Sequence, residues 1–479
     1  MLILRKTKAR LSLWILAACA PLYLFLSGCR FDLPQSTLDP KGPVAREQLD
    51  LFMVTVWVSL FIFVVVGGVL AWAVWRYRFR PGDENKPLPK QGHGNPLIEI
   101  GLIVASVLLL VIIAIPTLDA IWYITELPED AENYEASLLG AWYSPAASVH
   151  EQAELLALAD TADEDDVLII KATGYQWWWN FEYPQLGIKS SNEFLIPVGK
   201  VVRVELRSAD VIHSFWLPKL AGKIDMMPGR LNWMWIQADE AGHYYGQCAE
   251  FCGESHAYML FRCDAVSDTE FADWVAGYRK GQGAPGGFLA EATEDNPQPS
   301  NSDHWLAWIR AVQADPESMK GDPVQHGAML FTGKAGCTTC HAIQGSPYQT
   351  VQGPDLTYVS ARKTMAAGLL DNTERGPSTE IKDEFLHENF YRWILNTNQE
   401  YPVQVGETNE GDPITEDGLL ILDSETGEYV GADDDIKPGN LMFWGEGNYG
   451  SILARLKAEG DPLTTNEVEA LTQYLMTLR

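Results

Sequence analysis

Residues 248–259 read CAEFCGESHAYM and place two thiols (Cys248, Cys252), an imidazole (His256) and a thioether (Met259) in one short stretch. Thiolate, thioether and imidazole together favour copper, and methionine is not an ordinary zinc ligand. With His213 upstream, these donors exceed what one four-coordinate ion needs, and they suit two copper ions bridged by both sulfurs. A single His or Met of this kind would more often belong to a β-sheet core. The whole set at this spacing predicts a metal centre.

The residues around this stretch have the pattern of β-strands. Apolar runs at 167–170 and 194–196 are followed by a Pro-Val-Gly turn at 197–199, and apolar residues then alternate over 202–206. Turn signals at such intervals predict a small all-β sandwich or barrel that ends near Val266. We assign residues 119–279 to this domain.

From about Leu51 to Val266 the chain resembles subunit II of cytochrome c oxidase, whose cupredoxin domain carries the binuclear copper centre CuA. The segments 210–215 (DVIHSF), 223–225 (KID) and 228–230 (PGR) share the resemblance. It implies that two cysteines bridge the coppers, two histidines are terminal ligands, a methionine is a weak axial ligand and one main-chain oxygen contributes. The bridging cysteines would be Cys248 and Cys252, and the terminal histidines His213 and His256. Met259 would be the axial methionine, and Glu250 would give the main-chain oxygen.

Two further residues near the copper motif gain a role from the same resemblance. The Glu250 side chain would also reach a magnesium ion at the junction with subunit I, although a solvated loop carboxylate is the simpler interpretation. In the segment 174–180 (GYQWWWN), Trp177 occupies the position where an electron enters from cytochrome c. Three adjacent tryptophans cannot all face one side of a strand, so Trp178 or Trp179 is expected in the core. Cys263 is expected to be a small buried thiol.

The N-terminal part predicts a membrane anchor. Apolar runs at 51–75 and 97–115, the second closed by Pro116, are long enough to span a bilayer, so residues 29–118 form a transmembrane hairpin. The loop between them is rich in Arg and Lys and is therefore cytoplasmic, with everything after Pro116 outside. Glu99 lies at the cytoplasmic end of the second span. The resemblance places it at the mouth of a proton-uptake channel, but Leu102 and Ser106 depart from the family pattern, and a first-turn Glu also favours the helix dipole.

Residues 1–28 have the layout of a secretory signal, with basic residues before an apolar run at 11–26. The segment 26–29 (LSGC) resembles the bacterial lipobox, which implies that Cys29 becomes a lipidated N-terminus. The alternatives are a chance cysteine or a retained third spanning helix.

Residues 337–341 (CTTCH) form the c-type haem attachment pattern, in which Cys337 and Cys340 bond the haem covalently and His341 binds iron. Zinc or a disulfide is the weaker alternative. The Gly- and Pro-rich residues 280–320 are expected to be a linker before an all-α domain at 321–479. A capping box at Thr464 and Glu467 begins its last helix.

The opposite axial ligand of the haem is assigned by resemblance. Residues 437–442 (KPGNLM) resemble the loop that delivers the axial methionine of small cytochromes c, here Met442, and residues 353–357 (GPDLT) resemble their haem-edge loop. Phe443 stands where the family usually has Pro, and an acidic insertion at 400–435 lengthens the path. Three other residues remain alternative ligands: Met365, Met476 and His387.

The charge of the chain is divided unevenly. Up to Leu118 there are 12 Lys/Arg against 7 Asp/Glu, and after it 23 against 57. The acidic outer part excludes nucleic acid as a partner and favours basic proteins. Taken together, the sequence predicts a multidomain protein of the bacterial cytoplasmic membrane, with two transmembrane helices, a cupredoxin-like domain and a cytochrome c domain on the periplasmic side.

The resemblance implies a subunit II that takes electrons from a small cytochrome or a quinol–cytochrome c reductase through haem c to CuA, and on to subunit I for the reduction of oxygen. Two alternatives remain open. One is the electron-input subunit of a CuA-containing nitric oxide reductase. The other is a stand-alone lipoprotein that binds copper.

Overall fold

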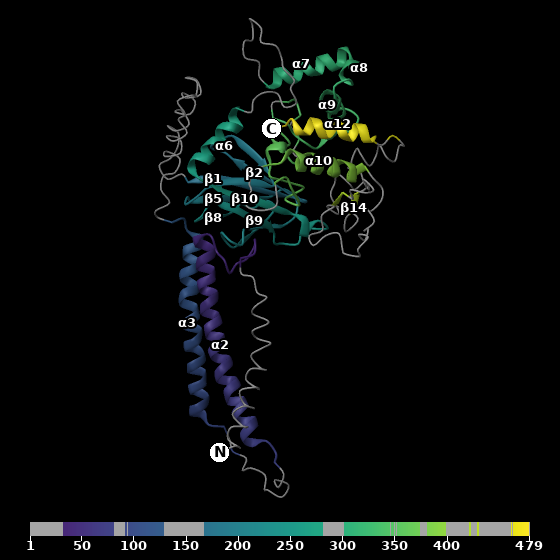
Figure 1. Cartoon of the computed structure of the whole chain (residues 1–479). Helices are drawn as coiled ribbons and strands as arrows, with labels where there is room; N and C mark the ends of the chain where they lie inside the picture. Colours follow the sequence, from purple (N-terminus) through teal and green to yellow (C-terminus); the bar gives the residue numbers. More distant parts are fainter. Residues whose placement is uncertain are drawn as a thin grey trace, which may run out of the picture.

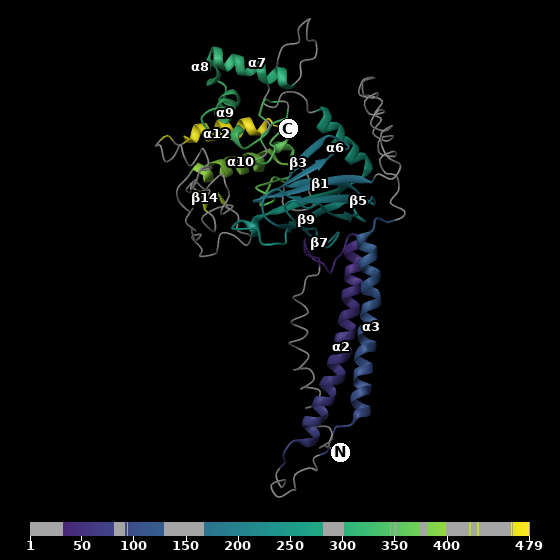
Figure 2. The same ribbon diagram turned by 180° about the vertical axis from the view of Figure 1, so that it is seen from behind.

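The computed structural model describes residues 32–80, 92, 94–128, 167–280, 301–344, 346–348, 350, 352–373, 381–398, 421–422, 429–430, 461 and 463–478. Two long helices form a stalk, a β domain stands at one end of it, and a mostly helical C-terminal domain lies beside the β domain (Figure 1). The view from behind shows the same arrangement of stalk, β domain and C-terminal domain (Figure 2).

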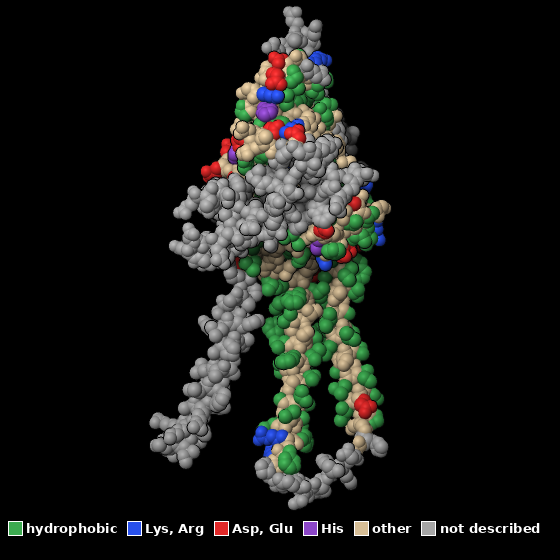
Figure 3. Space-filling model, turned by 90° about the vertical axis from the view of Figure 1, so that its right-hand side faces the viewer, with side chains coloured by type: hydrophobic (Ala, Val, Ile, Leu, Met, Phe, Trp, Pro, Cys, Tyr) green, Lys and Arg blue, Asp and Glu red, His purple; other side chains and the backbone are tan. Residues whose placement is uncertain are grey.

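The stalk consists of α2 (Pro43–Tyr77) and α3 (Pro96–Thr125), both long and apolar enough to cross a membrane. Hydrophobic side chains cover both helices along their length (Figure 3). The second helix does not end at Pro116 as the sequence suggested. Proline removes only one backbone donor, and the helix continues to Thr125, with the Thr117 hydroxyl donating to the carbonyl of Ile113 at 2.7 Å.

The β domain is a sandwich of two five-stranded sheets, in the orders β3-β2-β1-β5-β8 and β4-β10-β9-β6-β7. Buried and less buried residues alternate along β1 and β5, as expected where one face packs on a core. This confirms the β domain predicted from the sequence. The strands are β1 (Leu168–Tyr175), β2 (Trp178–Tyr183), β3 (Ile188–Ser191), β4 (Glu193–Pro197), β5 (Val202–Ser208), β6 (His213–Trp216), β7 (Lys223–Met226), β8 (Asn232–Ile236), β9 (Gly242–Cys248) and β10 (Leu260–Val266).

The core of the sandwich is strongly aromatic. Trp179, Phe181, Phe215 and Phe261 are fully or almost fully buried and contact one another edge-on or stacked. Trp179 is therefore a core residue as predicted, and Cys263 on β10 is buried as predicted, with burial raising the pKa of its thiol well above the usual value. The helix α6 (Asp268–Lys280) follows β10 and covers one side of the sandwich.

The start of α2 is fixed to the β domain by main-chain and side-chain contacts. The Lys41 amide donates to the Lys219 carbonyl at 2.7 Å, and the Lys41 carbonyl accepts from the Asp239 amide at 2.8 Å. Arg46 pairs with Asp239 at 2.5 Å. At the end of α3 the Tyr123 ring packs on Trp235, so both helices meet the β domain at the same end.

The C-terminal domain begins earlier than the sequence suggested. Residues 280–320 are not a linker throughout, because Trp305 and Trp308 of α7 lie buried in this domain's core. Nor is the domain all-α, since two short two-stranded sheets accompany its helices. Its elements are α7 (Asn301–Ala314), α8 (Pro316–Met319), α9 (Pro323–Thr332), η2 (Cys337–Thr339), η3 (Val359–Ala361), β11 (Thr364–Met365), β12 (Leu370–Asp371), α10 (Asp383–Asn398), β13 (Ile421–Leu422), β14 (Tyr429–Val430) and α12 (Thr465–Met476).

Close packing of α9 on α12 organises this domain. A Cβ at Gly327 would stand only 2.0 Å from the Ala470 carbonyl oxygen, so this crossing requires glycine. The capping box of Thr464 and Glu467 at the start of α12 is confirmed. The predicted signal segment, Cys29 and Met442 lie outside the described residues, as does most of the acidic insertion.

Candidate functional site

The β9–β10 ladder brings the ends of the copper motif together. Cys248 ends β9, Met259 immediately precedes β10, and the Cys248 amide donates to the Met259 carbonyl at 2.9 Å. His213 begins β6, which pairs with β9 through Phe215 and Cys248. A residue distant in sequence is thus placed beside the loop that carries the other predicted ligands.

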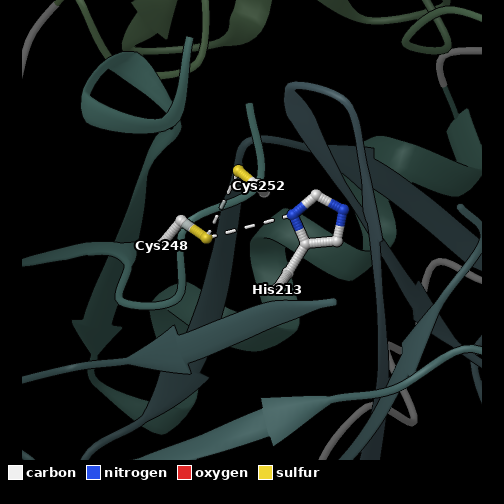
Figure 4. A group of neighbouring side chains, drawn as sticks. All are labelled: His213, Cys248 and Cys252. Atoms are coloured by element: carbon white, nitrogen blue, oxygen red, sulfur yellow. Dashed lines mark hydrogen bonds between the residues drawn. The ribbon is translucent and has the colours of Figure 1, made fainter. Parts of the chain in front are cut away.

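The two thiols lie at the centre of the group. Cys248 Sγ stands 3.8 Å from Cys252 Sγ and 3.9 Å from His213 Nδ1 (Figure 4). Cys252 Sγ lies 3.6 Å from His256 Nδ1 and 3.8 Å from Met259 Sδ. The carbonyl oxygen of Glu250 lies 3.3 Å from Cys248 Sγ, so all six predicted donor groups converge.

The pocket is buried and chemically prepared for a soft metal. Cys248, Cys252, His213 and Met259 are each at most 4% exposed. The neighbouring Cys252, together with His213, lowers the pKa of Cys248 to about 3 against the opposing effect of burial. A thiolate is the form of cysteine that binds metals. Paired thiols flanked by two imidazoles and a thioether fit a pair of copper ions better than zinc.

Asp210 orients the imidazole of His213. One carboxylate oxygen lies 2.8 Å from His213 Nε2, which leaves Nδ1 directed at the sulfurs. The same carboxylate accepts the backbone amides of Gln176 at 2.7 Å and Val211 at 2.6 Å. Such a partner fixes the tautomer and ring angle of a metal ligand. Asp210 was given no role from the sequence, because its spacing from His213 acquires meaning only once the ring orientation is known.

Trp177 contacts the copper loop directly. Its indole Nε1 donates to the Cys252 carbonyl at 3.0 Å, and the Gln176 side-chain Nε2 donates to the same oxygen at 2.8 Å. Gly253 has φ +122, and a Cβ there would stand 2.8 Å from the Trp177 ring. The loop conformation therefore depends on glycine at this position, and the Trp177 side chain lies directly against the copper loop.

The side chain of Glu250 is exposed, whereas its carbonyl faces the sulfurs. The carboxylate is therefore available to a group outside this chain. Glu99 lies exposed in the first turn of α3, behind the N-cap Asn95. This position is compatible with both interpretations made from the sequence, helix-dipole stabilisation and a proton path completed elsewhere.

The residues 337–341 form a second site in the C-terminal domain. His341 Nδ1 lies 2.7 Å from the Pro354 carbonyl, which leaves Nε2 for a metal, and burial lowers the pKa of this imidazole. The Gly353 amide donates to the Cys340 carbonyl at 2.7 Å, and a Cβ at Gly353 would lie 2.8 Å from the His341 ring. The structure thus brings the predicted haem-edge loop against the CTTCH segment.

These features fit a covalently attached haem. Burial raises the pKa of Cys337 to about 12 and also raises that of Cys340, so neither thiol has the thiolate character of Cys248. The buried Arg362 has a guanidinium Nε with no hydrogen-bond partner among the described residues, as expected beside an anionic group. Within the described part of the chain, the ligand atoms of His213, Cys248 and Cys252 lie close enough together to hold a metal ion.

The alternative axial ligands occupy packing positions. Met365 lies in the short strand β11 and is buried in the domain core, and Met476 packs against the same core. His387 on α10 pairs with Glu469 at 3.0 Å at the surface. Met442 lies outside the described residues, so its assignment as the axial ligand stays a prediction.

Comparisons with known proteins agree with this geometry. Residues 186–266 match the family model described as cytochrome c oxidase subunit II, periplasmic domain. Cytochrome c oxidase subunit 2 of Alkalihalophilus pseudofirmus is 33% identical over 362 residues, covering 76% of this chain and 85% of the relative. The subunit 2 of Bacillus sp. (strain PS3) is 26% identical over 466 residues, covering 95% and 94%. Quinol oxidase subunit 2 of Bacillus spizizenii is 32% identical over 250 residues, covering 52% and 67%.

Proposed function

Because the chain belongs to the cytochrome c oxidase subunit II family, we propose that it is the electron-transfer subunit of a haem-copper terminal oxidase. The chain accepts electrons outside the membrane and delivers them to subunit I, which reduces oxygen to water. One observation carries this proposal. Six donor groups from two distant segments converge in one buried pocket above the membrane helices.

The residues of the pocket have distinct roles in this proposal. Cys248 and Cys252 would hold both metals as thiolates, His213 and His256 would each bind one, and Met259 and the Glu250 carbonyl would complete the set. When bound, the copper pair and the haem supply one-electron carriers. The protein holds the donors on a paired ladder in an aromatic core, so they move little between redox states and water is excluded.

In the C-terminal domain, Cys337 and Cys340 would attach the haem, and His341 and Met442 would hold its iron. Arg362, with its unsatisfied Nε, would face an anionic edge of that group. The donor is a small soluble or membrane-bound cytochrome, or a quinol–cytochrome c reductase, and Trp177 is where electrons from outside the chain reach the copper loop.

The remaining assignments concern the membrane. The two apolar helices and the outer β domain support a subunit of the bacterial cytoplasmic membrane with both redox domains on the periplasmic side. Residues 1–28 would be removed as a signal, with Cys29 lipidated. Glu99 would open a proton path on the cytoplasmic side, and the exposed Glu250 carboxylate would bind magnesium at the junction with subunit I.

The decisive experiment is purification of the complex that contains this chain, with metal analysis and oxygen-uptake assays. Wild type should contain two coppers in this subunit and one covalent haem, and should consume oxygen with a reduced cytochrome. Cys252→Ala should lose copper and oxygen uptake. Cys263→Ala, which removes a buried thiol outside the pocket, should retain both. A Cys252→Ala complex with full copper and full uptake would contradict the proposal.

The same preparation separates the alternatives. A nitric oxide reductase would consume nitric oxide in place of oxygen. One relative is named a quinol oxidase subunit, and a complex of that kind would accept electrons from quinol without a cytochrome. A stand-alone copper carrier would release copper readily and would co-purify with no large subunit. A stable pocket buried beneath the aromatic core favours the electron-transfer role over a carrier.

A further inference from the structure

The β domain and the C-terminal domain meet at a charged surface on β4 and β10. Glu193 on β4 is half-buried and accepts the backbone amides of Lys363 and Thr364, each at 3.1 Å, and the Thr364 hydroxyl at 3.2 Å. Asp264 on β10 pairs with the Lys363 ammonium at 2.5 Å. Two acidic residues of one domain thus bind two consecutive residues of the other.

Beside this pair, the tip of the β11–β12 hairpin packs on the start of β10. Arg262 donates to the Gly368 carbonyl at 2.7 Å, and a Cβ on Gly368 would stand 3.3 Å from the Leu260 Cβ. Ala366, Ala367 and Gly368 all have positive φ (52, 59 and 81), a backbone shape that alanine adopts only where surrounding contacts impose it.

A third contact joins α6 to the C-terminal domain. The Tyr358 hydroxyl donates to the Tyr278 carbonyl at 2.7 Å, and the two rings lie 4.1 Å apart. Glu193, Arg262 and Asp264, together with Tyr278, form what we call the docking surface. It receives the segment 358–368.

The docking surface is close to both redox sites. Leu260 directly follows the predicted copper ligand Met259, so the hairpin tip touches the first residue beyond the pocket. On the other side, Arg362 precedes Lys363 and donates to the Asp355 carbonyl, in the loop that supports His341. Few residues therefore separate the domain contact from either site.

We propose that the docking surface holds the C-terminal domain in one fixed position on β4 and β10, so that electrons pass between the two sites within a single rigid unit rather than after a tethered encounter. This inference rests on the proposed function. Buried ion pairs add little net affinity, because desolvation offsets their attraction. They do favour this one position, since in any other the Asp264 and Glu193 carboxylates lose the partners that Lys363 and Thr364 supply.

The charges around Glu193 agree with a specific docked state. Burial raises the pKa of Glu193 to about 7, and Asp264 adds to this, while Arg362 and the two amides oppose it. For Asp264, burial acts to raise the pKa, but His243 and Lys363 outweigh it and lower it. Arg262 and Tyr278 also face this surface, and Tyr245, Tyr358 and Asp371 are further ionisable groups that act on these two.

Hydrogen exchange measured by mass spectrometry on the full chain in its complex tests the docked geometry without relying on cofactors. In wild type the Lys363 and Thr364 amides should be protected. Glu193→Ala should accelerate their exchange about tenfold or more, because each amide loses its acceptor oxygen. Glu193→Gln, which keeps an acceptor oxygen, should restore most of the protection. Glu205→Ala, at a largely buried carboxylate of β5, is the matched control and should change nothing.

Electron transfer from haem to copper, followed after rapid photoreduction, tests the positioning role. In wild type its rate should be independent of solvent viscosity. In Glu193→Ala it should become slower and viscosity-dependent, with the haem and copper spectra unchanged. Unprotected wild-type amides, or amides unaffected by Glu193→Ala, would overturn the docked geometry. A wild-type rate that already falls with viscosity would overturn the rigid unit, whereas missing copper or haem would refute the proposed function itself.

Discussion

Asp210 should control how tightly the pocket binds copper. Its carboxylate makes three hydrogen bonds, to His213 Nε2 and to the amides of Gln176 and Val211. Asp210→Ala removes all three. The His213 ring then loses the group that aims Nδ1 at Cys248, and loss of such a partner costs about 10- to 100-fold in metal affinity. That range corresponds to about 1.4–2.7 kcal/mol.

The affinity can be measured by competition between the full chain and a chelator of known copper affinity. Asp210→Asn keeps one acceptor oxygen and should show a smaller loss than alanine. Asp273→Ala, at an exposed carboxylate on α6, should bind copper like wild type. The reasoning fails if Asp210→Ala binds copper within about twofold of wild type, a difference smaller than the loss of one charged hydrogen bond.

Three further predictions address stability, haem attachment and pH. Gly246→Ala would place a Cβ 2.2 Å from the buried Phe261 ring, so thermal unfolding should show a loss of about 1–3 kcal/mol. Gly353→Ala would intrude on the His341 ring at 2.8 Å, so covalent haem content measured by absorbance should fall. Burial, reinforced by Asp264, raises the pKa of Glu193 to about 7, so the contribution of this group should be largest below pH 4.5 and should be lost as pH rises through about 7, which amide exchange corrected for its intrinsic pH dependence should detect.

Each of these has a control and a contrary outcome. Gly277→Ala on α6 meets no atom within 4 Å and should not destabilise the domain. If Gly246→Ala unfolds at the wild-type temperature, the core is looser than described. Normal haem content in Gly353→Ala would show that the close approach of Gly353 to His341 is not needed for haem attachment. The pH trend should vanish in Glu193→Gln, and its persistence there would assign it to another group.

Sequence patterns were sufficient for the copper pocket because its chemistry is concentrated in a short segment. The alternation in β1 and β5 and the donor spacing at 248–259 both survive in the structure, and His213 lies where the resemblance placed it. Asp210 was missed because a carboxylate three residues from a histidine is common and gains meaning only when the ring orientation is known.

The errors concern places where tertiary contacts override local signals. The Gly- and Pro-rich composition after Lys280 concealed an amphipathic helix, and only the burial of Trp305 and Trp308 shows that α7 belongs to the C-terminal core. Pro116 suggested a helix end, yet α3 continues because one missing donor is a small loss in a long apolar helix. The Glu193 contacts could not be read from sequence, since they join residues 170 positions apart.

The hydrogen bond between the Cys248 amide and the Met259 carbonyl has a consequence for how such proteins diversify. It closes the strand ladder immediately below the donor loop, so residues 249–258 contribute nothing to the register of β9 on β10. Insertions, deletions or substitutions in that loop would leave the pairing of β9 with β10 intact. The scaffold can therefore gain, lose or retune a metal site by exchange of one hairpin loop, and evolution can vary its redox chemistry without redesigning the domain.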